Sequence, residues 1–141
     1  MDPRHFQQLA SELVNGSSVA HMRTAISRAY YASYNVSVEI LKNMGFSISE
    51  GPSGHGQIQR YLNNCGNQNV NKIGSQIMDL HSRRIDADYR LNKTSVENPK
   101  TAKALVKQAE KMIDALDTHC FGSERISIIE AIKSYKESTN Q

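Results

Sequence analysis

The chain has 141 residues, of which 38% are hydrophobic and 22% charged, and its formal net charge at pH 7 is +3. This length fits one domain, and the composition excludes a disordered chain, which would combine few apolar residues with a large net charge. No apolar run approaches the about 18 residues of a membrane-spanning helix, so we expect no membrane association. The mild positive charge permits contact with nucleic acid without demanding it.

Two cysteines, Cys65 and Cys120, are too few for a disulfide framework, and they form no C-x-x-C pair that would indicate zinc. The first residues, MDPRHFQQLA, contain no apolar signal segment. We therefore expect a cytoplasmic protein that uses no metal and no other cofactor.

Apolar residues recur at helical spacing from the start of the chain. Asp2-Pro3 can open a first helix, because Asp caps helices and Pro fits the first helical position. Asn15-Gly16 then ends it. A long second helix is predicted from Ser17-Ser18 to about Met44, with Gly45 as its C-terminal stop.

The same spacing continues through the rest of the chain. The predicted elements are a loop over 47–56, a short helix over 58–66, a regular helix over 70–91, a loop over 92–98, a helix that opens at Pro99 and ends at Phe121-Gly122-Ser123, and a last helix over 126–135. No β-alternation and no repeat interrupts them. We expect an all-α, up-and-down helical bundle of five to six helices, forming a single domain over 1–141 with a frayed polar tail from about residue 137.

Arg84 breaks the apolar pattern of the helix over 70–91, because it lies on the inward face between Leu80 and Ala87. An isolated buried charge costs several kcal/mol, so we expect a partner, and Asp88 stands one helical turn away. Arg84 is then either part of a structural pair at the edge of the core or an arginine that extends to solvent. The alternative is an arginine held at an intersubunit groove, where its planar fork binds phosphate.

Two further cationic positions suggest contact with an anion. Arg28 lies on a polar line of the second predicted helix, spaced by sevens between His21 and Asn35, which is also typical of a solvated helix face. His55 lies in the glycine-rich loop just before a helix start, where backbone N–H groups favour a phosphate. It is equally compatible with a loop residue that has no role.

Three segments resemble elements of HEPN domains, in the order that this family has them. Residues 25–34, AISRAYYASY, resemble the signature helix with the pattern sRaYYAxf. Residues 53–55, SGH, resemble the family's loop histidine, and residues 80–89, LHSRRIDADY, resemble its R-x-x-A-D-Y element. The resemblance covers roughly residues 18–116 and is closest to small stand-alone HEPN proteins that often occur beside minimal nucleotidyltransferases. The residues at family-like positions are Arg28, Tyr31, His55, Arg84, Asp88 and Tyr89.

The resemblance implies a helical bundle that commonly forms a homodimer. Many members of the family are metal-independent ribonucleases of toxin–antitoxin, antiphage or CRISPR-associated systems, and their catalytic motif is Arg-x4-6-His. In such a site, histidine acts as general acid and base on the ribose 2′-hydroxyl and arginine neutralises the phosphate. None of the five histidines here has an arginine at that spacing before it, so the usual motif is absent and the enzymatic activity stays open.

Three hypotheses remain. The first, which we favour, is a non-catalytic HEPN module that binds RNA, a nucleotide or a nucleotidyltransferase-like protein within a toxin–antitoxin or defence-type system. The second is a divergent, dimeric ribonuclease that uses His55 or His81. His81 lies three residues before Arg84 on the same predicted helix, so these two side chains can face one groove. In the third, Arg28, Arg84 and Asp88 form only an internal polar network that fixes helix packing.

Overall fold

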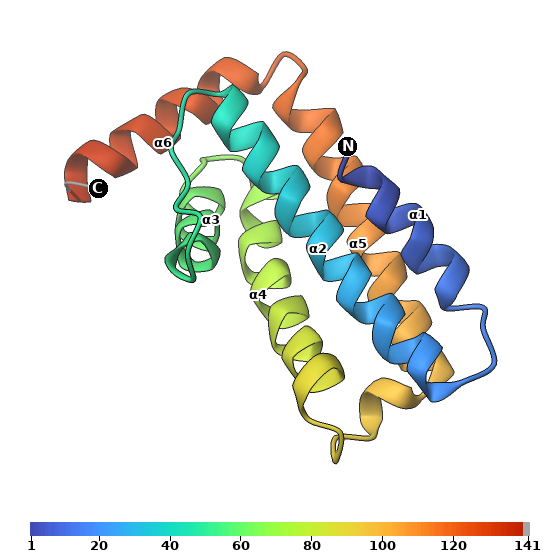
Figure 1. Cartoon of the computed structure of the whole chain (residues 1–141). Coiled ribbons are helices and arrows are strands. Elements are labelled where there is room, and N and C mark those ends of the chain that lie inside the picture. The colour runs from blue at the N-terminus through green and yellow to red at the C-terminus, as the bar shows by residue number, and fades with distance from the viewer. Residues whose placement is uncertain (140–141) are drawn as a thin grey trace. The chain divides into compact units, whose positions relative to one another are not determined.

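The computed structural model describes residues 1–139, and every regular element in them is helical (Figure 1). The elements are α1 Arg4–Leu13, α2 Val19–Asn43, α3 Ser53–Asn63, α4 Gln68–Tyr89, the 3-10 helix η1 Ser95–Glu97, α5 Pro99–Cys120 and α6 Arg125–Thr139. The prediction of an all-α fold with five to six helices is confirmed. Within 1–139, no helix is both long and apolar enough to cross a membrane.

Two helices end just before the glycines that the sequence predicts as stops. Gly45, just after α2, has φ 99°, and Gly66, after α3, has φ 70°. These left-handed values favour glycine because a Cβ would meet the backbone. The predicted ends of both helices at these glycines are thus correct to within a few residues.

Other boundaries differ from the prediction. α3 begins at Ser53 rather than near residue 58, directly after Pro52, whose φ of −57° is already helical. α6 continues to Thr139, past residue 137, where the frayed tail was expected to begin. Residues 140–141 of that tail lie outside the described residues.

The chain forms two units of contacting residues. Unit 1 comprises Met1–Val36 and Asp79–Ile113, and unit 2 comprises Ser37–Met78 and the chain from Asp114 onward. The division falls within α2, α4 and α5, so each of these helices supplies residues to both units.

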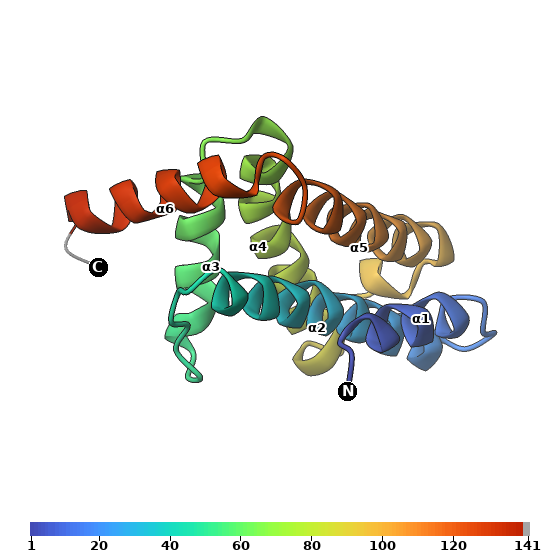
Figure 2. The ribbon, with the colours of Figure 1, turned by 90° about the horizontal axis from the view of Figure 1, so that it is seen from above.

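Unit 1 is built from α1, the first part of α2, the last part of α4, η1 and the first part of α5. α1 and the first part of α2 run in opposite directions (Figures 1 and 2). Its fully buried side chains include Ala10, Ile26, Ala29, Tyr30, Leu80, Val96, Ala102 and Ala109. A polar contact reinforces this apolar core, since the buried Gln7 Nε2 donates to the backbone oxygen of Val106 at 2.9 Å.

Unit 2 contains α3, α6 and the adjoining ends of α2, α4 and α5, and α3 contacts α6. The rings of Phe46 and Tyr61 lie 5.7 Å apart in its core. Gly74 of α4 lies so close to α3 that a Cβ there would be 2.9 Å from the backbone oxygen of Gln59. A glycine is therefore needed for this close helix approach.

Candidate functional site

Arg84 on α4 is the centre of a group of polar and aromatic side chains in unit 1. Its Nε lies 2.9 Å from Oδ2 of Asp88, and its Nη2 donates to the hydroxyl of Tyr31 on α2. The predicted Arg84–Asp88 pair is therefore confirmed. The contact with Asp88 is an ion pair rather than a full hydrogen bond, because the Nε–H is not directed at the carboxylate.

The ring of Tyr31 lies within reach of two guanidinium groups. The central carbon of Arg28 is 4.7 Å from the ring centroid, and that of Arg84 is 4.9 Å from it. Arg28 also lies 5.4 Å from the ring of Phe6, and Arg84 lies 5.4 Å from the ring of Tyr89. These distances fit cation–π contacts, which hold both guanidinium planes against aromatic surfaces.

We call Arg28, Tyr31, Arg84, Asp88 and Tyr89 the arginine–tyrosine cluster. Ser27 links its two halves, because the Ser27 hydroxyl donates to Asp88 Oδ2 at 3.0 Å and accepts from Arg28 Nη2 at 3.3 Å. Among residues 1–139, no carboxylate pairs with Arg28. The cluster therefore holds two positive charges and one negative charge.

The cluster is accessible from outside unit 1. Arg28 and Tyr31 are half-buried, the side chain of Arg84 is 12% exposed, and Tyr89 is 67% exposed. The exposed ring of Tyr89 lies beside Arg84, and Arg84 shares the half-buried ring of Tyr31 with Arg28. This arrangement suits a planar or phosphate-bearing ligand. Five of the six residues selected from the sequence meet here.

The sixth, His55, belongs to unit 2. It lies in the first turn of α3, not in the loop before a helix, because α3 starts at Ser53. Since the cluster belongs to unit 1, we define the candidate site by the other five residues.

His81, the second candidate histidine, packs against the buried Tyr30 on α2. The two ring centroids are 5.1 Å apart, in an edge-on arrangement. Burial lowers the pKa of His81 below its ordinary value, and the positive charge of Arg84 lowers this pKa further. His81 is therefore neutral at pH 7. Burial likewise raises the pKa of Tyr30 far above its ordinary value, so its hydroxyl stays protonated.

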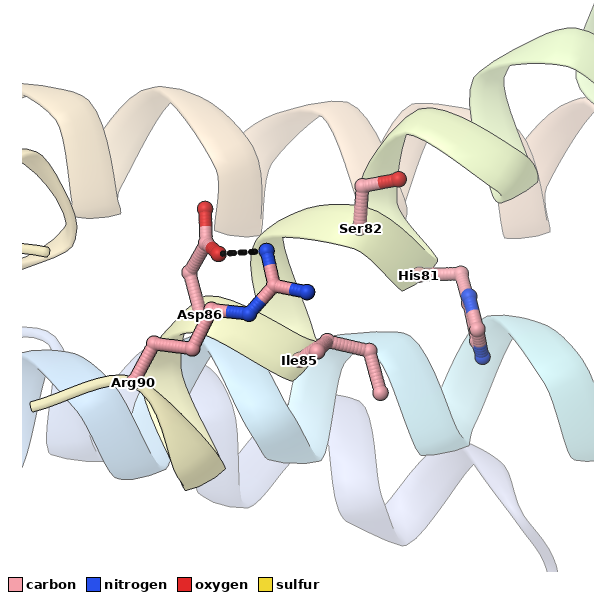
Figure 3. Close-up of a pocket in the computed structure, with 5 residues that line it drawn as sticks. All are labelled: His81, Ser82, Ile85, Asp86 and Arg90. Carbon is pink, nitrogen blue, oxygen red and sulfur yellow. Dashed lines mark hydrogen bonds and ion pairs between the residues drawn. The ribbon is translucent and has the colours of Figure 1, made fainter.

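A pocket of about 270 Å³ lies along α4 in unit 1 (Figure 3). It is lined by His81, Ser82, Ile85, Asp86 and Arg90. Figure 3 shows the Arg90 side chain folded back to Asp86, with which it forms an ion pair at 3.3 Å, while His81 lies further along the helix beyond Ile85. The pocket thus brings an imidazole and a guanidinium to one cavity, but the guanidinium belongs to Arg90 and not to Arg84.

Arg23 on α2 is a buried arginine that the sequence analysis did not select. It is 8% exposed, and its Nη2 lies 2.7 Å from Oε2 of Glu97. Its guanidinium also donates, at 2.8–3.4 Å, to the backbone oxygens of Asp86, Ala87, Arg90, Leu91 and Lys93. It therefore caps the C-terminal end of α4 and ties the following turn to α2. Arg23 lies three residues before Ile26 and seven before Tyr30, so it falls on the apolar face of α2. A charged residue on that face is the sequence signal that would have identified it.

No three side chains among His, Cys, Asp and Glu in the described part of the chain are grouped so that they could hold a metal ion. Comparison of the chain with protein-family models, with curated proteins and with solved structures found no match.

Proposed function

We propose that this protein is a non-catalytic, HEPN-like helical module that binds RNA or a nucleotide through the arginine–tyrosine cluster. The observation that supports this most strongly is the position of Tyr31 beside two guanidinium groups, only one of which has a carboxylate partner. Such a cluster can accept a phosphate without first losing an ion pair.

The two arginines would then have different roles. Arg28 is held by aromatic rings and one hydroxyl, so its remaining N–H groups can bind phosphate oxygens in the bidentate manner that its fork allows. Arg84 is oriented by Asp88 and Tyr31, so it supports the site and adds positive potential. The exposed ring of Tyr89 offers a face for stacking on a base, which is tolerant of sequence.

The biological setting that we propose comes from the resemblance described above. In this setting the protein is a cytoplasmic homodimer that acts in a toxin–antitoxin or defence-type system together with a nucleotidyltransferase-like partner. The AISRAYYASY segment lies on α2 and the LHSRRIDADY segment lies on α4, and their side chains meet in unit 1.

Replacing Arg28 with alanine is expected to weaken RNA binding about tenfold or more. A hydrogen bond to a charged group contributes about 1.5–3 kcal/mol, and 1.4 kcal/mol corresponds to a factor of ten in affinity. Mobility shifts with tRNA and total RNA would measure the change. Arg83→Ala is the matched control, because Arg83 lies in the same unit outside the cluster and donates to Ser95. Equal losses in the two variants would contradict the assignment of the site.

A divergent, metal-independent ribonuclease is the second candidate function, and the pocket on α4 favours it. His81 is neutral and can act as a general base on a ribose hydroxyl, while Arg90 can neutralise the phosphate. This version differs from the sequence hypothesis, in which Arg84 was the partner of His81.

If this second candidate is correct, incubation with tRNA in EDTA yields cleavage that is lost in both His81→Ala and Arg90→Ala. Because the pKa of His81 is lowered from 6.5, the base stays unprotonated as the pH falls through 6.5, so cleavage persists below that pH and declines only further down. RNA that is bound but stays intact would exclude this function and leave the non-catalytic one. Cleavage abolished by EDTA would also speak against it.

A further inference from the structure

The outward face of α5 in unit 1 carries a line of positive charge. Lys100, Lys103, Lys107 and Lys111 are spaced by three or four residues and are all exposed. On a helix with 3.6 residues per turn, this spacing keeps them on one face. We call these four residues the lysine stripe. At a rise of about 1.5 Å per residue, it is about 16 Å long.

Little in the structure neutralises this stripe. Lys107 forms an ion pair with Glu110 at 3.3 Å, but the two side chains are 60% and 44% exposed, and such exposed pairs are weak. Glu110 is the only acidic residue of α5 within unit 1, and the exposed Asp114 follows Lys111 by one helical turn, so four lysines face two carboxylates along this side of the helix. In the described residues, the other three lysines pair with no carboxylate. The stripe therefore keeps a positive potential.

The composition of this face indicates what kind of partner it suits. Beside the lysines, it presents Ala104 and Gln108 and no large apolar side chain. Protein interfaces are depleted in lysine and have aromatic or other apolar residues at their centre. A helix that lies on a membrane needs an apolar face toward the lipid. The apolar face of α5 is instead buried in the protein, through Ala102, Val106, Ala109, Met112 and Ile113.

Phosphate groups are the remaining class of polyanion, and lysine is suited to them. A nucleic acid strand in a duplex carries one phosphate about every 3.4 Å along the axis, more closely than the lysines follow one another, so each lysine can meet a phosphate. Such contacts are sequence-independent and fix the position of the strand.

We propose that the lysine stripe binds the phosphodiester backbone of a nucleic acid without reading its sequence. The stripe adds a second contact surface to the RNA binding proposed above. It does not depend on the arginine–tyrosine cluster, because backbone contacts by lysine need neither Arg28 nor Arg84.

The test is the salt dependence of binding to a short RNA of mixed sequence, measured by fluorescence anisotropy between about 50 and 200 mM salt. A variant with all four lysines of the stripe replaced by glutamine is compared with one in which Lys42, Lys72, Lys93 and Lys133 are replaced. These control lysines are also exposed and lie on other segments, so both variants lose the same charge. Each phosphate contact with a single strand contributes about 0.7 to the slope of log K against log salt. The magnitude of this slope is therefore expected to fall by about 2–3 in the stripe variant and by less than about 1 in the control variant.

Three results would overturn the proposal. An unchanged slope in the stripe variant would show that these lysines meet no phosphates. Equal changes in the two variants would show that only net charge matters. Binding to polyglutamate is measured in parallel. If the stripe variant loses this binding and keeps its RNA binding, the partner of the stripe is an acidic protein. The proposed function fails separately, because Arg28→Ala would then leave RNA binding intact while the stripe variant weakens it.

Discussion

Replacing Arg23 with methionine is expected to lower the free energy of unfolding by about 3–5 kcal/mol, the cost of removing one partner from a buried ion pair. Arg23 is 8% exposed, and Glu97 would keep its negative charge without a partner in a site that is only 24% exposed. The backbone oxygens at the end of α4 would also lose their donors. Urea unfolding followed by circular dichroism would measure the loss.

Arg90→Met is the matched control for this prediction. It makes the same chemical change on an arginine whose side chain is 59% exposed and whose ion pair with Asp86 is of the surface type. Such pairs contribute about 0–1 kcal/mol, so this variant is expected to remain close to the original stability. Arg23→Lys should restore only part of the loss, because one ammonium group cannot replace the planar fork of five donors. Similar stabilities for Arg23→Met and Arg90→Met would show that Arg23 is not a buried cap.

Replacing Arg84 with alanine is expected to destabilise the protein by about 2–4 kcal/mol, somewhat less than the change at Arg23. The reason is that the side chain of Asp88 is 25% exposed and keeps its hydrogen bond from Ser27. Its negative charge therefore retains a hydrogen-bond donor and contact with water. The measurement is again urea unfolding, together with RNA binding at a temperature where the variant is folded.

Tyr31→Phe separates the two contacts of Arg84. It removes the hydroxyl that accepts from Arg84 but keeps the ring against both arginines, so the free energy of unfolding is expected to fall by about 0.5–1.5 kcal/mol.

Two results of the Arg84→Ala experiment would decide the role of this residue. Unchanged stability with lost RNA binding would place Arg84 at the surface as a direct ligand of phosphate. Lost stability with normal binding by the folded fraction would leave only the internal polar network.

Much of the fold was predictable because it depends on local patterns. Apolar spacing located the helices, and the glycines at 45 and 66 marked two ends, since both requirements act within a few residues. The Arg84–Asp88 pair was predictable for the same reason, because residues four apart on a helix are neighbours.

The contacts that the sequence missed join residues far apart in the chain. The carbonyl oxygens that Arg23 caps lie 63–70 residues later, and backbone oxygens carry no signature of residue type. The pocket pairs His81 with Arg90 at a spacing that no simple motif describes. The lysine stripe was hidden in the mild net charge of the whole chain, because a sum says nothing of which face the charges share.

The cap made by Arg23 has a consequence for how a ligand meets the cluster. Arg23 and Arg28 lie on the same helix, and Arg23 fixes both the end of α4 and the turn that follows Tyr89 to that helix. The backbones that carry the arginine–tyrosine cluster are thus set in place before any ligand arrives. Ordering a loop on binding costs conformational entropy, and here that cost is met during folding. The affinity of the proposed site would therefore depend on the contacts themselves, and loosening the end of α4 would weaken RNA binding without changing any side chain of the arginine–tyrosine cluster.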